Sequence, residues 1–185
     1  NEKGPMSSRN RSFTIAQTEK LPDLKSVVIR AINNNARDFL NPPIRNLGYK
    51  GIAKTATEIK KWFKGSKAVE SEFQTAAMLM ERAGTGGALF RNLYRDFLQA
   101  SYEITGLDAL HKGYEAYREH AKKWTDISGL FQKNGETKHE NDVKKASEIF
   151  LQLSNDEKQT MEALLQATSD ARRNSTNSAP GNQFD

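Results

Sequence analysis

The sequence of 185 residues contains no cysteine. Without a thiol, the chain has no disulfide bond, no cysteine nucleophile and no zinc site built on thiolates. It also has no stretch of 18 consecutive apolar residues, and its first ten residues lack the apolar segment of a signal peptide. We therefore expect a chain that neither spans a membrane nor is targeted to one, with a cytoplasmic location.

Proline and glycine are sparse, at 5 and 12 residues, while hydrophobic residues make up 36% and charged residues 28%. This composition is polar, but it lies above the hydrophobicity at which chains stay disordered. The length suits one domain with its own core. Because the chain opens on Asn1 and the residues around Met6 resemble a linker, we expect it to be a piece of a longer protein.

Positive charge is concentrated in the first third of the chain. The net charge is +8 over residues 1–65 and −3 over residues 66–185. A basic half of this kind could face an acidic partner, a phosphorylated ligand or nucleic acid, or it could be a solvated surface, which is the simpler interpretation. We expect no nucleic-acid binding, since no zinc-finger, basic-zipper or RNA-recognition signature accompanies the basic residues.

Apolar residues recur at helical spacing over most of the chain, which predicts an all-α bundle of six or seven helices with a short N-terminal extended segment. The segment 89–102 has the broadest apolar face, so we expect it to lie centrally. Thr105 with Asp108, Thr137 with Glu140, and Ser154 with Glu157 resemble capping boxes that each open a helix. The predicted helices cover 22–40, 52–65, 69–83, 89–102, 105–124, 137–153 and 154–165.

The ends of the chain lack this periodicity. We assign residues 1–20 to a linker and extended segment, residues 21–173 to the helical domain and residues 174–185 to a disordered tail. The stretch RSFTIAQ at 11–17 alternates weakly and predicts one strand, which could belong to the sheet of a neighbouring domain.

The stretch AGTGGALFRNLYRDFL at 83–98 is the candidate binding motif. Gly84 can end one helix in the left-handed conformation, and Thr85 can cap the next one. Gly86 and Gly87 allow a close approach to the backbone. The stretch is therefore either a tight corner between two helices or the floor of a pocket. In a pocket, the helix start and Arg91, which borders the apolar stripe and is expected to contribute little to the core, would meet a carbonyl, a carboxylate or a phosphate.

Residues for catalysis or metal binding are not arranged in any known pattern. The histidines His111, His120 and His139 have no partner at the spacing of a zinc site, so we expect no metal and no cofactor. No serine elbow, Walker loop or complete dinucleotide fingerprint is present. We expect this chain by itself not to be an enzyme.

The stretches NPPIRNLGYKGI and AGTGGALFRNLYRDFL resemble the C-terminal helical domain of the bacterial butirosin biosynthesis protein H family. There, a glycine-rich turn precedes Phe-Arg, Tyr and Phe-Leu on one helix. The resemblance extends over roughly Lys20 to Leu153. It implies a papain-like catalytic domain, N-terminal to this one in the same polypeptide, whose cysteine transfers an acyl group from a carrier-protein thioester or hydrolyses a related bond.

Under this resemblance the chain is an accessory domain of a cysteine-dependent acyltransferase or hydrolase. It would pack on the catalytic domain, and its basic half could receive an acyl carrier protein. The residues that map onto the motif, and would line the substrate cleft, are Gly84, Thr85, Gly86, Gly87, Arg91 and Tyr94; none is implied to be catalytic. The alternative is an independent helical module for protein interaction or homo-oligomerisation, in which the glycine turn is only structural.

Overall fold

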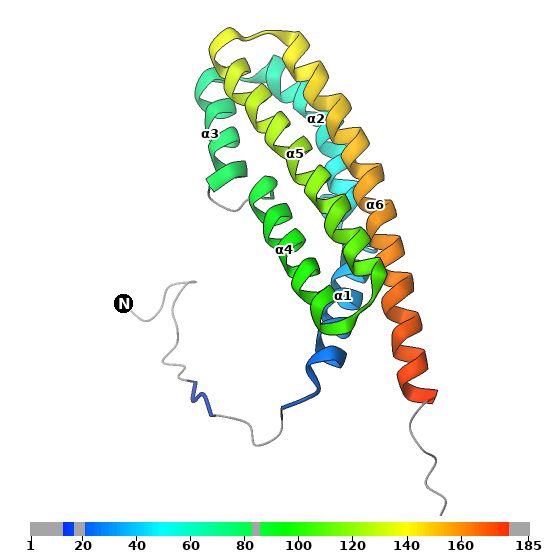
Figure 1. The fold of residues 1–185 in the computed structure, drawn as a ribbon. Coiled ribbons are helices and arrows are strands. Elements are labelled where there is room, and N and C mark those ends of the chain that lie inside the picture. Colours follow the sequence, from blue (N-terminus) through cyan, green and yellow to red (C-terminus); the bar gives the residue numbers. More distant parts are fainter. Residues whose placement is uncertain (1–12, 17–20, 83–85, 178–185) are drawn as a thin grey trace, which may run out of the picture.

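A computed structural model of the chain describes residues 13–16, 21–82 and 86–177 (Figure 1). Within these ranges the structure is an all-α bundle of six helices, as the periodicity predicted. None of these helices combines the length and the apolar character needed to cross a bilayer. The helices are α1 (Leu24–Leu40), α2 (Gly48–Gly65), α3 (Val69–Arg82), α4 (Ala88–Thr105), α5 (Asp108–Thr137) and α6 (Glu140–Asn177).

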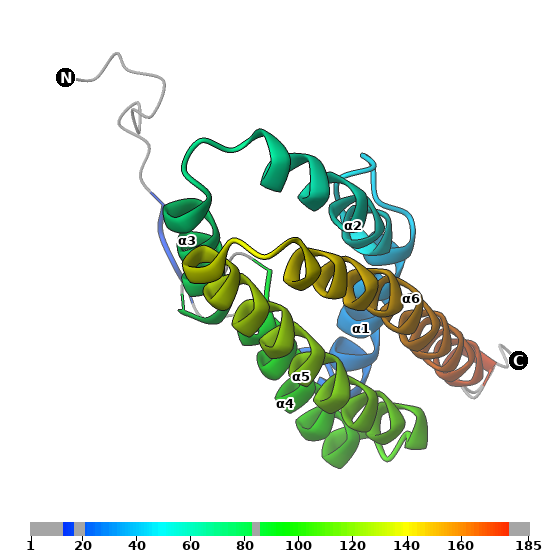
Figure 2. The same ribbon diagram turned by 90° about the horizontal axis from the view of Figure 1, so that it is seen from above.

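Two long helices, α5 and α6, form the centre of the bundle. They pack on each other, and the four shorter helices pack along their outer sides, with α3 and α4 against α5 and with α1 and α2 against α6 (Figures 1 and 2). The expectation that segment 89–102 lies centrally is therefore wrong. Only α5 and α6 are long enough to span both halves of the bundle, so they take the central place, and α4 lies at the edge.

The core consists of two apolar clusters, one in each half of the bundle. The first is aromatic, with Trp62 stacked on Phe73 at 4.4 Å between ring centroids and Phe131 at 5.0 Å from Phe73. The second joins the other half of α5 and α6 to α1 and α4, around residues such as Ile32 and Leu98. The boundary between the two clusters is where the candidate site lies.

Hydroxyl side chains hold α2 against α6 at close range. Ser147 donates a hydrogen bond to the carbonyl of Ala56 in α2 at 2.7 Å, and Ser154 donates to the carbonyl of Tyr49 at 2.8 Å. Ser154 was predicted to cap a separate helix. It lies instead within the continuous α6, because its hydroxyl finds a partner on a neighbouring helix. Helix α6 continues past residue 165, where the last predicted helix ended, and past Arg173, the predicted end of the helical domain, to Asn177.

Two other predicted capping boxes also differ from the structure. Thr105 is the last residue of α4, and its side chain accepts a hydrogen bond from the amide of Leu107, which is the N-cap of α5. Thr137 is the last residue of α5, not the start of another helix. In both cases the threonine has the spacing of a helix start but is the last residue of the preceding helix. That helix ends there because the next residue, Gly106 or Lys138, adopts the left-handed conformation.

The N-terminal helix begins at Leu24, two residues later than the prediction of a start at Pro22. Asp23 is the N-cap of α1 and accepts a hydrogen bond from the amide of Ser26 at 2.8 Å, while Pro22 precedes the cap. Upstream, residues 13–16 of the predicted strand form no strand and are exposed, and residues 11, 12 and 17 lie outside the described part.

Candidate functional site

The glycine turn joins α3 and α4 at close range. A β-carbon on Gly87 would lie 2.3 Å from the carbonyl oxygen of Met80, and Gly86 adopts a φ of +101°, which favours glycine. Gly87 is the N-cap of α4, so the expectation that Thr85 caps this helix is wrong; Thr85 and Gly84 themselves lie outside the described residues. The described residues of the turn, Gly86 and Gly87, thus form a tight corner between the two helices, which was the first of the two interpretations.

Arg91, one turn into α4, points into the bundle. Its Nε and Nη2 atoms donate to the two carboxylate oxygens of Glu157 in α6, each at 2.9 Å, and Nη1 donates to the carbonyl oxygen of Gly86 at 2.5 Å. The guanidinium also lies 4.3 Å from the centre of the Trp124 ring. Arg91 therefore ties the glycine turn to the centre of the bundle, contrary to the expectation that it contributes little to the core.

Glu157, the partner of Arg91, is a fully buried carboxylate. Its side chain is 1% exposed, against 14% for Arg91, and its Oε1 also accepts a hydrogen bond from Trp124 Nε1 at 2.6 Å. A carboxylate at this depth requires such partners, because its hydration is lost and only charged hydrogen bonds replace it. The pair lies between the two apolar clusters, with Leu153 and Met161 one turn away on either side of Glu157.

Two tyrosines lie beside the ion pair. Tyr94 and Tyr117 meet edge to face, with ring centroids 4.8 Å apart, and burial raises the pKa of both phenols. Glu157 raises the pKa of Tyr117 further, which indicates that this phenol lies near the carboxylate. Both groups are therefore protonated over the whole ordinary pH range.

These residues line a small cavity of about 250 Å³ between α1 and α4. It has aromatic walls, and the ion pair supplies the only charged groups among the described residues that line it. Of the predicted site residues, Arg91 and Tyr94 lie in it, whereas Gly86 and Gly87 are absent from its lining and Gly86 reaches it only through its bond to Arg91. The lining residues are Asn35, Phe39, Phe90, Arg91, Tyr94, Tyr117, Glu157 and Met161.

The residues around the ion pair that the sequence analysis missed include Tyr117, Trp124 and Glu157. A signal for Glu157 existed, because Phe150, Leu153, Met161 and Leu164 continue one apolar row with Glu157 at its centre. A lone carboxylate in such a row predicts a buried ion pair. The sequence analysis instead assigned Glu157 to a capping box with Ser154, and so the buried ion pair was not predicted.

An apolar stripe on α4 adjoins the cavity. Phe90, Leu93, Phe97 and Ile104 lie on one side of this helix and are 48%, 56%, 36% and 40% exposed. We call these four residues the α4 stripe. Phe90 belongs both to the stripe and to the cavity lining, so the two features are continuous. The broad apolar face seen in the sequence is thus half buried against α5 and half open to solvent.

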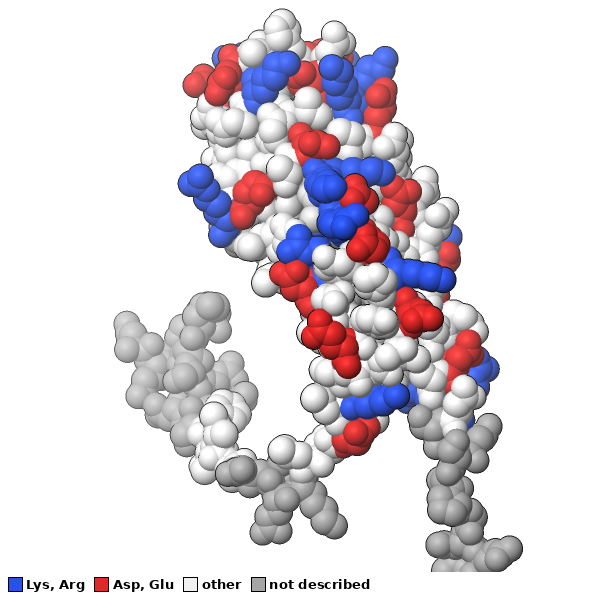
Figure 3. Space-filling view, viewed as in Figure 1, with Lys and Arg blue, Asp and Glu red and all other residues white. Residues whose placement is uncertain are grey.

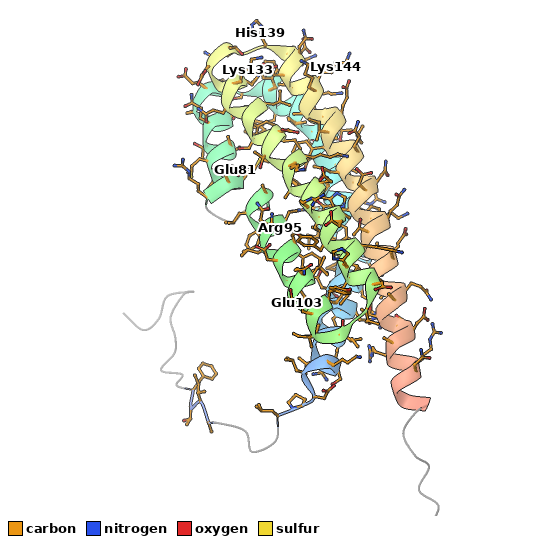
Figure 4. All side chains as sticks on the ribbon, in the orientation of Figure 1. Glu81, Arg95, Glu103, Lys133, His139 and Lys144 are labelled. Carbon is orange, nitrogen blue, oxygen red and sulfur yellow. The ribbon has the colours of Figure 1, made fainter. Side chains whose placement is uncertain are left out.

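On the face that carries α4, the charged side chains of the described residues form no patch of one sign (Figure 3). Basic and acidic residues are interspersed there (Figure 3). Within the described residues, no group of three His, Asp or Glu side chains is placed to hold a metal ion. His139 lies at the turn between α5 and α6, at the end of the bundle beyond α3 (Figure 4).

His120 is the one histidine close to the site. Its Nε2 lies 3.1 Å from the hydroxyl oxygen of Thr160, which donates its own proton to the carbonyl of Asp156. Nε2 therefore carries the hydrogen, and Nδ1 is a buried lone pair without a partner. Burial lowers the pKa of His120 from 6.5, only partly opposed by Glu157 and Asp156 and assisted by Lys123 and Arg91.

This environment predicts a pH dependence of stability. As pH falls below about 6.5, the unfolded chain binds a proton at His120 that the folded chain still rejects, so the free energy of unfolding decreases. We expect this decrease in chemical denaturation series between pH 7 and pH 5, above the range in which carboxylates titrate. The variant His120→Gln should lose it and the exposed His139→Gln should retain it. An unchanged pH profile in His120→Gln would contradict the assignment.

Comparisons with known proteins place the chain in a family. No curated protein and no solved structure matches it. A family model does match, over residues 1–164, which include all of α1 to α5 and the part of α6 that carries Glu157 and Met161. The chain therefore belongs to the family described as Domain of unknown function (DUF4872).

Proposed function

We propose that the chain is an accessory helical domain that packs through the α4 stripe on a cysteine-dependent acyltransferase or hydrolase domain of the same polypeptide. The catalytic domain supplies the nucleophile and its base. This domain supplies one wall of the substrate cleft, at the cavity lined by Arg91 and Tyr94. The proposal extends to an acyl carrier protein that approaches the basic first third of the chain.

The observation that carries the proposal is the α4 stripe. Four large apolar side chains on one helix, each at least 36% exposed, form the kind of surface that proteins use to bind a partner. Because the stripe runs directly into the cavity at Phe90, a domain that covers the stripe also closes one side of the cavity. Packing and cleft formation are then two consequences of one contact.

The resemblance to the butirosin biosynthesis protein H family supports the identity of the partner. The stretch that resembles that family, from Gly84 to Leu98, contains the turn, the ion-pair arginine, the cavity tyrosine and the stripe residues Phe90, Leu93 and Phe97. A papain-like domain encoded immediately upstream of Asn1 is therefore the first expectation to check in the gene.

A substitution in the stripe tests the contact. With the upstream domain expressed as a separate molecule, Leu93→Glu should weaken association of the two domains by roughly tenfold or more, because a carboxylate is buried without a partner. Association is measured by isothermal titration calorimetry, and acyl transfer or hydrolysis is followed with a thioester substrate.

Leu151→Glu on α6 is the matched control, since Leu151 is also an exposed leucine in the middle of a helix, at 47% against 56% for Leu93. Neither variant should change the thermal stability of the chain alone. Equal association in both variants would contradict the proposal. If no cysteine domain is encoded upstream, and Leu93→Glu instead abolishes self-association, the independent oligomerisation module is the correct function.

A further inference from the structure

The walls of the cavity are suited to a flat apolar group. Phe39, Phe90 and Tyr94 present aromatic side chains, and Met161 adds a flexible thioether. Aromatic walls bind planar groups by stacked or edge-to-face contact, and a volume of about 250 Å³ accommodates one substituted ring. Shape alone, however, does not decide the charge or the polarity of the ligand.

The charge of the ligand follows from the hydrogen bonds of the ion pair. Glu157 already accepts from two guanidinium nitrogens and from Trp124, and all three nitrogens of the Arg91 guanidinium already donate. The two opposite charges cancel, and no other charged residue lines the cavity in the part of the chain that the structure describes. A charged ligand would therefore lose its hydration without gaining a counter-charge, which is costly.

The polarity of the ligand follows from the tyrosine hydroxyls. Tyr117 is only 3% exposed and lines the cavity, yet its hydroxyl makes no hydrogen bond to any residue that the structure describes. The hydroxyl of Tyr94 faces only the sulfur of Met161, at 3.9 Å, which is a weak acceptor. The Tyr117 hydroxyl itself keeps contact with solvent at the cavity, so a ligand oxygen placed there would accept its hydrogen bond in place of water.

We infer that the cavity binds an uncharged planar group that carries a carbonyl-type oxygen, with the hydroxyl of Tyr117 donating a hydrogen bond to that oxygen. The inference deepens the proposed function, on which it rests for its biological role, because it names the class of substrate group that the cleft receives. Binding itself requires only the bundle, which has its own core, and so it is tested on the 185-residue chain.

The probe is benzamide, compared with toluene, benzoate and benzamidinium of nearly the same size. The chain is labelled with ¹³C at the methionine methyl groups, of which Met161 lines the cavity and Met78 lies on the outer surface as an internal control. We expect benzamide to shift the Met161 signal in a saturable manner and to leave Met78 unchanged. Benzoate and benzamidinium should bind at least tenfold more weakly.

Tyr117→Phe removes the proposed donor and keeps the ring. It should weaken benzamide binding roughly 3- to 10-fold, the range expected for one hydrogen bond, without changing the affinity for toluene. Tyr114→Phe, on the same helix but outside the cavity lining, should change neither affinity. The ligand series on the unsubstituted chain needs no variant, so the test stands even if Tyr117→Phe folds poorly.

Three results would overturn the inference: no saturable shift of Met161 with benzamide, equal or tighter binding of either charged analogue, or unchanged benzamide affinity in a folded Tyr117→Phe. These results are independent of the association experiment with Leu93→Glu. Benzamide binding with no effect of Leu93→Glu would retain this site and reject the proposed partner. The reverse outcome would retain the partner and reject this ligand chemistry.

Discussion

Replacing Arg91 with methionine should lower the free energy of unfolding by about 3–5 kcal/mol, because the buried carboxylate of Glu157 then loses its counter-charge. Methionine keeps most of the side-chain length, so the loss reports on charge and hydrogen bonding more than on volume. Of the three hydrogen bonds that Glu157 accepts, only the one from Trp124 would remain. Chemical denaturation followed by circular dichroism measures the change.

Arg95→Met is the matched control for this experiment. Arg95 lies one turn further along α4, and it pairs with Asp96, whose side chain is 63% exposed. A solvent-exposed pair contributes little, so this variant should lose less than about 1 kcal/mol. Similar losses in both arginine variants would show that the Arg91–Glu157 pair does not hold the bundle together.

A double variant separates the cost of an unpaired charge from the value of the pair. Arg91→Met with Glu157→Leu removes both charges, and it should be more stable than Arg91→Met alone, since no carboxylate is left buried. Because Arg91 holds the fold in this way, loss of binding in Arg91→Ala would not by itself identify it as a ligand residue. Tyr117→Phe is the cleaner probe of the cavity.

Replacing Gly87 with alanine should cost about 2–3 kcal/mol of folding free energy. The added β-carbon would lie 2.3 Å from the carbonyl oxygen of Met80 and 2.6 Å from its α-carbon, and backbone atoms cannot rotate away as a side chain can. Helices α3 and α4 would therefore have to separate. Thermal and chemical denaturation of the variant measure this cost.

Gly129→Ala is the control, because Gly129 lies within α5 and an added β-carbon meets no atom within 4 Å. There alanine should stabilise the chain by about 0.5–1 kcal/mol, through the lower entropy of the unfolded state and the better helix propensity. A Gly87→Ala variant as stable as the original chain would refute the close packing of α3 and α4 at this turn.

Local chemistry in the sequence was sufficient to determine the fold class and most helix positions. Apolar spacing identified α1 to α4, and the Asn-Pro-Pro step after Leu40 and the glycine after Lys64 marked two of their ends. These signals act within one or two turns of the chain, so a pattern of neighbouring residues contains them. The absence of cysteine likewise follows from the sequence alone.

Tertiary structure decided where polar residues within the helices find their partners. Ser154 and Glu157 have the spacing of a helix start, but both lie inside one long helix. There Ser154 donates to the carbonyl of Tyr49 and Glu157 pairs with Arg91, two residues that are distant in sequence. In the sequence, Arg91 likewise resembles a residue at the edge of an apolar stripe. In the structure it forms a buried ion pair with Glu157 on another helix. A hydrogen-bonding side chain in a helix can serve either a cap or a neighbouring helix, and only packing selects between them, because the partner lies on another element.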